Sequence, residues 1–323
     1  MEPTRRQFLG TAAAAAILPA IGAAPAGTPL PTRRLGQTGI EVSILGFGSG
    51  SRFLMYKDED KALEALARAL DLGITYIDTA HSYGDGQSEE RVGRLMPDRR
   101  KGITLATKLS ARTADDARRQ IELSLERLKT DHLDVLHIHA LSGPDDLAAI
   151  EKPDGVLKAL YEARDQKVTR AIGITCHASP VALRDALERH DFDCTQMALN
   201  AAMARMADAK GGMKATPMPA GSFEELALPV AVRKGMGVIA MKVFAQDQIL
   251  GAAPVDKLLA YALSLPVSLA SLGMPRPEHI ARNIELARGF TPMPAADRRR
   301  LTDSIAAEHK LSLAEFFRDH RDA

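Results

Sequence analysis

The chain lacks several features that would point to a particular class of protein. Its 323 residues include no tryptophan and only two cysteines, and 42 basic against 41 acidic residues leave a formal net charge of +1. Balanced charge provides neither a basic stripe for nucleic acid nor an acidic tail. Two cysteines outside any CxxC-type cluster argue against an iron–sulfur centre or a structural zinc site. The separation of Cys176 and Cys194 does not decide whether they pair.

The chain also lacks an apolar run long enough to span a membrane. Its most apolar run lies in a segment that resembles an export signal. Arg5 and Arg6 precede an apolar run from Thr11 to Ile21, and Ala24 to Ala26 offers small residues for cleavage. This order of charge, apolar core and cleavage site is typical of a signal peptide, and the paired arginines resemble the twin-arginine type. No run approaches the about 20 residues that span a bilayer. We expect residues 1–26 to be removed and residues 27–323 to reach the periplasm through the twin-arginine machinery, with no membrane span.

After the leader, helix-like and strand-like patterns alternate to the end of the chain. Apolar residues recur at helical spacing at Leu63, Leu66 and Leu70, and short β-rich runs lie between such segments. Alternation of this kind predicts a parallel sheet, and eight repeats without a long break favour a closed (β/α)8 TIM barrel. The expected strands are Val42–Phe47, Ile74–Ala80, Ile103–Thr107, Leu133–Ile138, Thr169–Thr175, Cys194–Leu199, Val238–Val243 and Val267–Leu272.

Two segments stand outside the repeat. The run Arg34–Val42, with a turn at Thr38-Gly39, predicts a β-hairpin that precedes the barrel and plugs its lower end. The stretch Ala201–Gly221 is rich in Met, Gly and Pro and shows no periodicity. Because it follows the sixth strand, it should lie on the catalytic rim, either as a flap over a ligand or as a solvated insertion.

Ionisable residues follow three successive strands at the points where the strands end. Asp78 lies near the end of the second expected strand and Tyr83 in the loop after it, while Lys108 follows the third strand and His139 the fourth. Strands more often end in apolar residues or turn formers, and the C-terminal ends of barrel strands are where active sites are built. These four side chains are therefore predicted to converge.

Together these four groups suit the protonation of a carbonyl oxygen. A nearby ammonium should lower the pKa of a phenol from about 10, so Lys108 should help Tyr83 to release its proton. An ion pair with Asp78 would keep a buried Lys108 charged, and His139 could hold the substrate oxygen. Side chains do not supply hydride, so a nicotinamide cofactor is implied.

The same segments resemble the aldo-keto reductase superfamily across nearly all of the chain that follows the leader. The sequence IDTAHSYGDGQSEERVG resembles the family signature around its aspartate and tyrosine, ATK resembles the lysine strand, and LDVLHIH resembles the histidine strand. The resemblance implies a catalytic tetrad of Asp78, Tyr83, Lys108 and His139. It also implies reduction of an aldehyde or ketone with NADPH, or alternatively NADH.

Cofactor contacts are implied by further resemblances. The segments AIGITCH, TQMALN and GVIAMKVF resemble those that contact the carboxamide and the ring of nicotinamide in the family. Here Cys176 replaces the usual asparagine and Met241 replaces the usual tyrosine. His177 or Gln196 would then take over carboxamide recognition. LGMPRPEHIARNIE resembles the segment that grips the 2′-phosphate. The implied cofactor residues are Gly48, Ser49, Thr175, Cys176, Gln196, Met241, Lys242, Phe244, Gly273, Arg276, His279 and Asn283.

Two other functions remain open at this point. His137 and His139 lie on one face of an expected strand and, with His177, could bind the metal of a barrel hydrolase. Some relatives of the superfamily serve instead as regulatory subunits that bind nicotinamide and turn over slowly.

Overall fold

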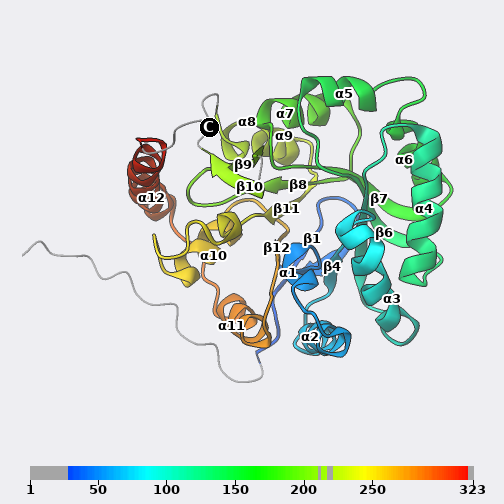
Figure 1. The fold of residues 1–323 in the computed structure, drawn as a ribbon, viewed down its shortest axis with the longest axis horizontal. Coiled ribbons are helices and arrows are strands. Elements are labelled where there is room, and N and C mark those ends of the chain that lie inside the picture. The colour runs from blue at the N-terminus through cyan, green and yellow to red at the C-terminus, as the bar shows by residue number, and fades with distance from the viewer. Residues whose placement is uncertain (1–27, 210–211, 217–220, 319–323) are drawn as a thin grey trace, which may run out of the picture.

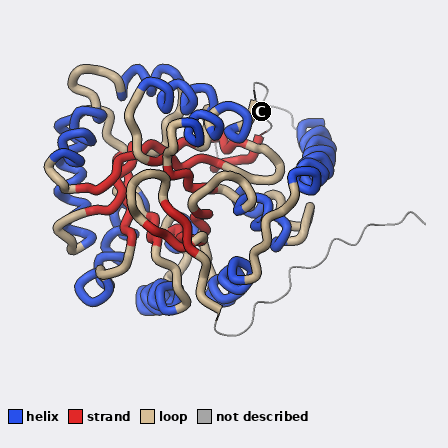
Figure 2. Tube along the Cα trace, turned by 180° about the vertical axis from the view of Figure 1, so that it is seen from behind, coloured by secondary structure: helices blue, strands red, loops and turns tan. Residues whose placement is uncertain are grey.

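Eight parallel strands close into a barrel. Helices surround these strands, as Figures 1 and 2 show. The computed structural model describes residues 28–209, 212–216 and 221–318, so the expected leader, residues 1–26, lies outside the described residues. The strands follow the ring order β11-β12-β3-β4-β5-β6-β7-β8, and each neighbouring pair within that order runs parallel. The predicted (β/α)8 barrel is confirmed.

The barrel strands lie where the β-rich runs predicted them, with shifts at their ends. Strands such as β5 and β6 are buried along their whole length, as expected where helices cover one side and other strands the other. The strands are β3 (Leu45–Gly48), β4 (Tyr76–Asp78), β5 (Thr104–Leu109), β6 (Leu133–Ile138), β7 (Thr169–Cys176), β8 (Cys194–Ala198), β11 (Gly237–Met241) and β12 (Leu269–Leu272).

The helices cover the outside of the ring and begin at residues that the sequence marks. Asp58 accepts hydrogen bonds from the first backbone N–H groups of α2, and Thr113 does the same for α4. The helices are α1 (Ser51–Leu54), α2 (Glu59–Asp71), α3 (Gln87–Arg99), α4 (Ala114–Leu128), α5 (Pro144–Ile150), α6 (Val156–Asp165), α7 (Pro180–Arg189), α8 (Phe223–Leu226), α9 (Leu228–Arg233), α10 (Val255–Leu263), α11 (Pro277–Arg288) and α12 (Ala295–Arg318), with 3₁₀ turns η1 (Tyr83–Gly86) and η2 (Ala245–Asp247).

A β-hairpin closes the lower end of the barrel, as predicted. Its strands β1 (Thr32–Arg34) and β2 (Glu41–Ser43) pair antiparallel. The hairpin residues Leu35, Ile40 and Val42 pack into one apolar cluster with inward side chains of the barrel strands, including Tyr76 and Ile239. This cluster fills the lower lumen and leaves the polar side chains to the upper end.

The expected first barrel strand, Val42–Phe47, is in fact divided between two elements. Val42 belongs to the hairpin, and the barrel strand begins at Leu45. The chain bends between them because Ser43 and Thr75 exchange hydrogen bonds of 2.9 Å from each backbone N–H to the other hydroxyl. These bonds replace the strand pairing that a continuous run would have made.

The stretch Ala201–Gly221 contains secondary structure that its composition did not predict. Strands β9 (Arg205–Ala209) and β10 (Gly212–Thr216) pair antiparallel in register from Arg205↔Thr216 to Ala209↔Gly212. Alanine, aspartate, lysine and glycine have low β-propensity, so the pairing is not visible as an apolar pattern. Residues 210–211 and 217–220 of this stretch lie outside the described residues. Its role as a flap stays a prediction.

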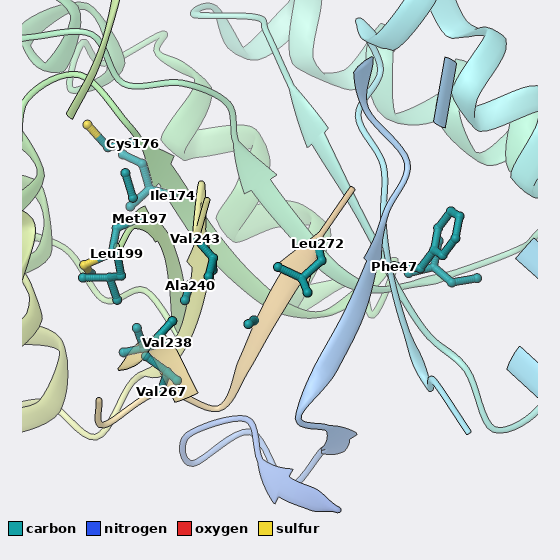
Figure 3. Close-up of a cluster of buried hydrophobic side chains, with 14 of the residues drawn as sticks. Phe47, Ile174, Cys176, Met197, Leu199, Val238, Ala240, Val243, Val267 and Leu272 are labelled. Carbon is teal, nitrogen blue, oxygen red and sulfur yellow. The ribbon is translucent and has the colours of Figure 1, made fainter. Parts of the chain in front are cut away.

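The two cysteines are buried and do not form a disulfide. Cys194 belongs to the apolar cluster inside the barrel, whereas Cys176 belongs to the larger core between the barrel and its helices. Figure 3 shows the Cys176 side chain near Ile174 and Met197 in that outer core. The wall of the barrel therefore keeps the two thiols apart.

Among the helices that the structure describes, none combines the length and the apolar character needed to cross a bilayer.

Candidate active site

A buried ion pair joins the ends of β4 and β5. Lys108 Nζ lies 2.8 Å from Asp78 Oδ1, and the two side chains are 1% and 6% exposed. Lys108 also donates a 2.6 Å hydrogen bond to the carbonyl oxygen of Thr79. Asp78 Oδ2 accepts from Gln196 Nε2 at 2.9 Å and from Ser271 Oγ at 3.3 Å. These extra bonds offset the desolvation that makes a buried ion pair costly.

Tyr83 and His139 complete the predicted group. The Tyr83 hydroxyl lies 3.3 Å from Lys108 Nζ, within hydrogen-bonding distance. The Tyr83 and His139 rings meet edge to face, with centroids 5.5 Å apart and planes at 78°. Ser82 Oγ lies 3.4 Å from His139 Nδ1, which leaves Nε2 of the imidazole for a ligand. All four predicted side chains thus converge at the upper end of the barrel.

Burial governs the proton affinities at this site. It raises the pKa of Tyr83, and Asp78 raises it further, while the charge of Lys108 lowers it. Lys108 thus lowers the pKa of this phenol as expected, but desolvation outweighs the ammonium and the net shift is upward. Burial alone would lower the pKa of Lys108, but Asp78 and Tyr83 raise it above its ordinary value. Burial and nearby cations hold the pKa of His139 well below its ordinary value, so the imidazole is neutral.

A cavity of about 560 Å³ opens beside these four residues. Met241 lies in its wall, and the ammonium of Lys242 lies in the same wall with a pKa lowered to about 8 by burial and then by Lys108 and Arg52. The predicted cofactor residues that line this cavity are Gly48, Thr175, Gln196, Met241, Lys242, Phe244 and Gly273.

Two predicted cofactor residues face elsewhere. The backbone N–H and the hydroxyl of Ser49 both donate to the carbonyl oxygen of Asp78, at 2.8 and 3.0 Å, so Ser49 secures the end of β4. The Cys176 thiol donates to the carbonyl oxygen of Leu141 at 2.9 Å and packs in the outer core, as Figure 3 shows. Successive strand residues point to opposite faces. Because Thr175 faces the cavity, Cys176 cannot, so it does not line the cavity as a cofactor residue, whereas His177 and Gln196, which were expected to take over carboxamide recognition, both do.

Three further predicted residues lie in or just before α11, outside the cavity wall. Arg276 is the residue that precedes the helix, and both it and His279 in the first turn are exposed. Asn283 is buried on the inner face of the helix. The chain reaches α11 directly from Gly273, which lies at the mouth of the cavity. A basic group at a helix N-terminus suits a phosphate, so phosphate binding there stays a prediction.

An ion pair that the sequence did not reveal crosses the mouth of the cavity. Arg52, just after β3, pairs with Asp247 in η2, just after β11, and both line the cavity. Arg52 also packs against Gly273, since a Cβ there would lie 2.7 Å from the Arg52 side chain. A search for charged residues shortly after every barrel strand, rather than after three of them, would have found both partners.

His137 does not share a metal site with His139. Its ring is fully buried, and burial first, then Lys108, lowers its pKa to about 3. Both of its nitrogens lack a hydrogen-bond partner in the described part of the chain. A Cβ at Gly173 would lie 2.5 Å from Nδ1, so the ring occupies space that only glycine leaves. Within residues 28–209, 212–216 and 221–318 no three His, Cys, Asp or Glu side chains are grouped as metal ligands, and the hydrolase alternative loses its ligand set.

The cavity has the chemistry that a nicotinamide nucleotide requires. Gln196 Oε1 is buried without a partner among the described residues, and it can accept from an amide N–H. Met241 offers a thioether to a ring face. Lys242 and Arg52 offer positive charge to a diphosphate. A thioether, an amide acceptor and two cations that line one cavity therefore fit such a ligand.

Comparisons with a family model and with curated proteins all identify the same family. The model of the Aldo/keto reductase family matches residues 44–315. Aldo-keto reductase YhdN of Bacillus subtilis is 40% identical over 156 residues, which cover 44% of this chain and 45% of that protein. Aldo-keto reductase yakc [NADP(+)] of Schizosaccharomyces pombe is 35% identical over 169 residues, 47% of each chain. In both alignments the chain thus spans about half the length of the curated relative.

Among solved structures, a putative aldo-keto reductase from Pseudomonas aeruginosa is similar to this chain. It superposes with a TM-score of 0.65 at 28% identity, over 80% of this chain and 96% of that one. The similarity in structure therefore extends over most of the barrel.

Proposed function

The chain belongs to the aldo/keto reductase family, and from that premise we propose that it is a nicotinamide-dependent oxidoreductase that reduces an aldehyde or ketone. The observation that carries the proposal is the placement of the Tyr83 hydroxyl, 3.3 Å from Lys108 Nζ, while Lys108 is paired with Asp78 at 2.8 Å. The set lies in one cavity with His139. A bound nicotinamide nucleotide supplies the hydride that reduces the carbonyl carbon.

In this proposal Tyr83 donates a proton to the carbonyl oxygen. Its raised pKa keeps the phenol protonated at neutral pH, so it is ready to act as an acid. The fixed charge of Lys108 stabilises the phenolate that forms when the proton leaves. Asp78 holds Lys108 in its charged form, and neutral His139 donates a hydrogen bond from Nε2 that orients the oxygen.

NADPH is the cofactor that we propose, with NADH as the alternative. Support comes from the cations of the cavity wall and from Arg276 and His279 at the start of α11, where a 2′-phosphate would meet a helix N-terminus. The name of the yeast relative, which includes NADP(+), points the same way. Binding of NADPH and NADH, compared by fluorescence titration of wild type and Arg276→Met, tests this preference.

We also propose export through a twin-arginine signal, on the strength of the order of charge, apolar run and small residues within positions 1–26. Because this route carries folded proteins, the cofactor would travel already bound. Cell fractionation of wild type and of a variant with Arg5→Lys and Arg6→Lys tests the route. Retention of the double variant in the cytoplasm supports it, and a periplasmic pool of the variant equal to wild type contradicts it.

The experiment for the reductase itself is a cofactor-oxidation screen against sugars, aliphatic aldehydes and aromatic ketones. Tyr83→Phe should reduce the rate with the best substrate by about 10²- to 10⁴-fold, and its affinity for NADPH should stay near that of wild type. Tyr56→Phe is the matched control, because Tyr56 is buried outside the cavity and its hydroxyl has no partner among the described residues. Oxidation by wild type at the background rate would favour the binding-only regulatory role.

A further inference from the structure

Tyr83 begins a turn in which the backbone is left-handed. The three residues that follow it, Gly84, Asp85 and Gly86, have φ angles of +60°, +55° and +103°. Glycine adopts such left-handed conformations freely, and Asp85 is the one residue of the three that has a Cβ. Contacts from the rest of the protein help to keep the turn, and with it the Tyr83 hydroxyl, in place.

Those contacts come from Arg127, which projects from α4. Its Nη1 donates to the carbonyl oxygen of His81 at 3.3 Å, and its Nη2 donates to that of Asp85 at 3.2 Å. The two carbonyls lie on either side of Tyr83 in the chain, two residues away in each direction. One rigid guanidinium thus fixes the separation of the two ends of the segment that carries the phenol.

The charge of Arg127 is balanced by a carboxylate that is 0% exposed. Glu89, on α3, has Oε2 at 3.5 Å from Arg127 Nη1. Its Oε1 accepts a 2.6 Å hydrogen bond from Thr107 Oγ1, on the strand residue just before Lys108. The Glu89 side chain therefore links the guanidinium under the Tyr83 turn to the strand that presents the lysine.

The fit around the guanidinium is tight. A Cβ at Gly86 would lie 2.2 Å from Arg127 Cζ, so only glycine leaves room at that position. His81 adds a second attachment, because its backbone N–H donates to the carbonyl oxygen of Lys108 at 3.0 Å. The clamp, by which we mean Arg127, Glu89 and Thr107, thus reaches both Tyr83 and Lys108 without entering the cavity.

We propose that Arg127, held by Glu89, is a positioning residue that sets the distance between the Tyr83 hydroxyl and Lys108 Nζ. The inference rests on the proposed function, since it treats Tyr83 as the proton donor. A misplacement of about 1 Å at a reacting group costs on the order of 100-fold in rate. Loss of the clamp should therefore lower kcat and leave cofactor binding unchanged.

The test compares Arg127→Met with Arg118→Met, each as the full chain. Arg118 lies on the same helix and makes an ion pair of 2.7 Å with Glu162 on α6, but it does not contact the turn. We expect Arg127→Met to lower kcat by about 10- to 100-fold with an NADPH dissociation constant within about twofold of wild type. Arg118→Met should match wild type in both. Added guanidinium ion should restore part of the activity that Arg127→Ala loses and should leave the wild-type-like activity of Arg118→Ala unchanged.

Hydrogen exchange of the amides of residues 79–86 provides a readout that does not depend on turnover. Faster exchange in Arg127→Met than in Arg118→Met supports the clamp even if wild type reduces no carbonyl, in which case the proposed function alone fails. If Arg127→Met does not fold, Glu89→Gln and Arg127→Lys take its place in the same measurements. Wild-type kcat together with wild-type exchange in a folded clamp variant overturns the inference.

Discussion

Gln196 donates a 2.9 Å hydrogen bond from Nε2 to Oδ2 of Asp78. The two residues belong to β8 and β4, which lie on opposite sides of the ring, four strands apart in either direction. The bond consumes one of the two N–H groups of the amide and leaves Oε1 buried without a partner among the described residues. Gln196 therefore orients the carboxylate that holds Lys108, in addition to the carboxamide contact predicted for it.

Replacing Gln196 by glutamate should make activity depend on pH in a way that replacement by leucine does not. Glutamate would place a second carboxylate beside that of Asp78. Two carboxylates this close share a proton, because the repulsion between two negative charges raises the pKa of one of them. At low pH the shared proton restores a donor to Asp78. We expect Gln196→Glu to recover kcat/KM as pH falls from 8 to 6, whereas Gln196→Leu stays low throughout. Parallel pH profiles for the two variants would contradict the role given to Nε2.

Lys242 should make cofactor affinity weaken in alkaline solution. The pKa of Lys242 is lowered to about 8, so its charge, which should attract the diphosphate, is present below that pH and lost above it. Binding of the anionic cofactor raises the pKa of Lys242. The affinity for the cofactor should therefore be constant below pH 8 and should fall by up to about tenfold per pH unit above it. Lys242→Met should bind NADPH more weakly at pH 7 and lose this alkaline fall. Titration of the dissociation constant from pH 6 to 10 tests it, and a similar alkaline fall in the variant would rule Lys242 out as its source.

The ion pair of Arg52 with Asp247 should slow the escape of the cofactor. It joins the segments after β3 and β11 across the mouth of the cavity, and both side chains are partly exposed. We expect Asp247→Asn to raise the NADPH off-rate by about 2- to 10-fold in stopped-flow displacement, since a partly exposed pair contributes up to about 1 kcal/mol. The on-rate should change little. Asp71→Asn removes a similar exposed partner of Arg99 far from the cavity and is the control. Equal NADPH off-rates for Asp247→Asn and Asp71→Asn would show that the ion pair of Arg52 with Asp247 does not slow dissociation of the cofactor.

His137 should cost stability rather than add to it. A buried polar group without a partner costs about 1–3 kcal/mol, and leucine has a similar volume. We expect His137→Leu to raise the free energy of unfolding, measured with urea, by about 1 kcal/mol or more. His132→Leu, at an exposed histidine paired with Asp131, should change it little. A clear loss of stability in His137→Leu would mean that its imidazole has a favourable partner.

The same histidine should make the protein sensitive to acid. In the folded state the pKa of His137 is lowered from 6.5 to about 3, so only the unfolded chain gains this proton between those values. Stability should therefore fall with pH below 6.5, by up to about 1.4 kcal/mol per unit for this group. His137→Leu should show a shallower decline between pH 6 and 4 than wild type. Identical declines would assign the acid sensitivity to other groups.

The barrel could be predicted because its signal is local and repeated. Each β-rich run followed by a helical pattern indicates the same architecture. An error at one strand end, such as the assignment of Val42 to the barrel, therefore does not change the predicted fold. Asp78, Lys108 and His139 could be found for a related reason: each lies at or just beyond the C-terminal end of a strand, and parallel strands bring such ends to one rim. Cys176 was misplaced although strand alternation, applied to Thr175, would have turned it outward.

The amino-acid sequence by itself determined three things: the alternation of strands and helices, the rim of the barrel at which the ionisable residues gather, and the chemistry that those residues can perform. Tertiary structure decided which of them touch: Gln196 with Asp78 across the lumen, Arg52 with Asp247 over the cavity, and Arg127 with the carbonyls beside Tyr83. The physical reason is that periodicity fixes the face to which a side chain points, whereas closure of the ring and the angle of each helix set the distances between side chains. Burial, which reversed the expected direction of the Tyr83 pKa, likewise arises only when the whole ring has closed.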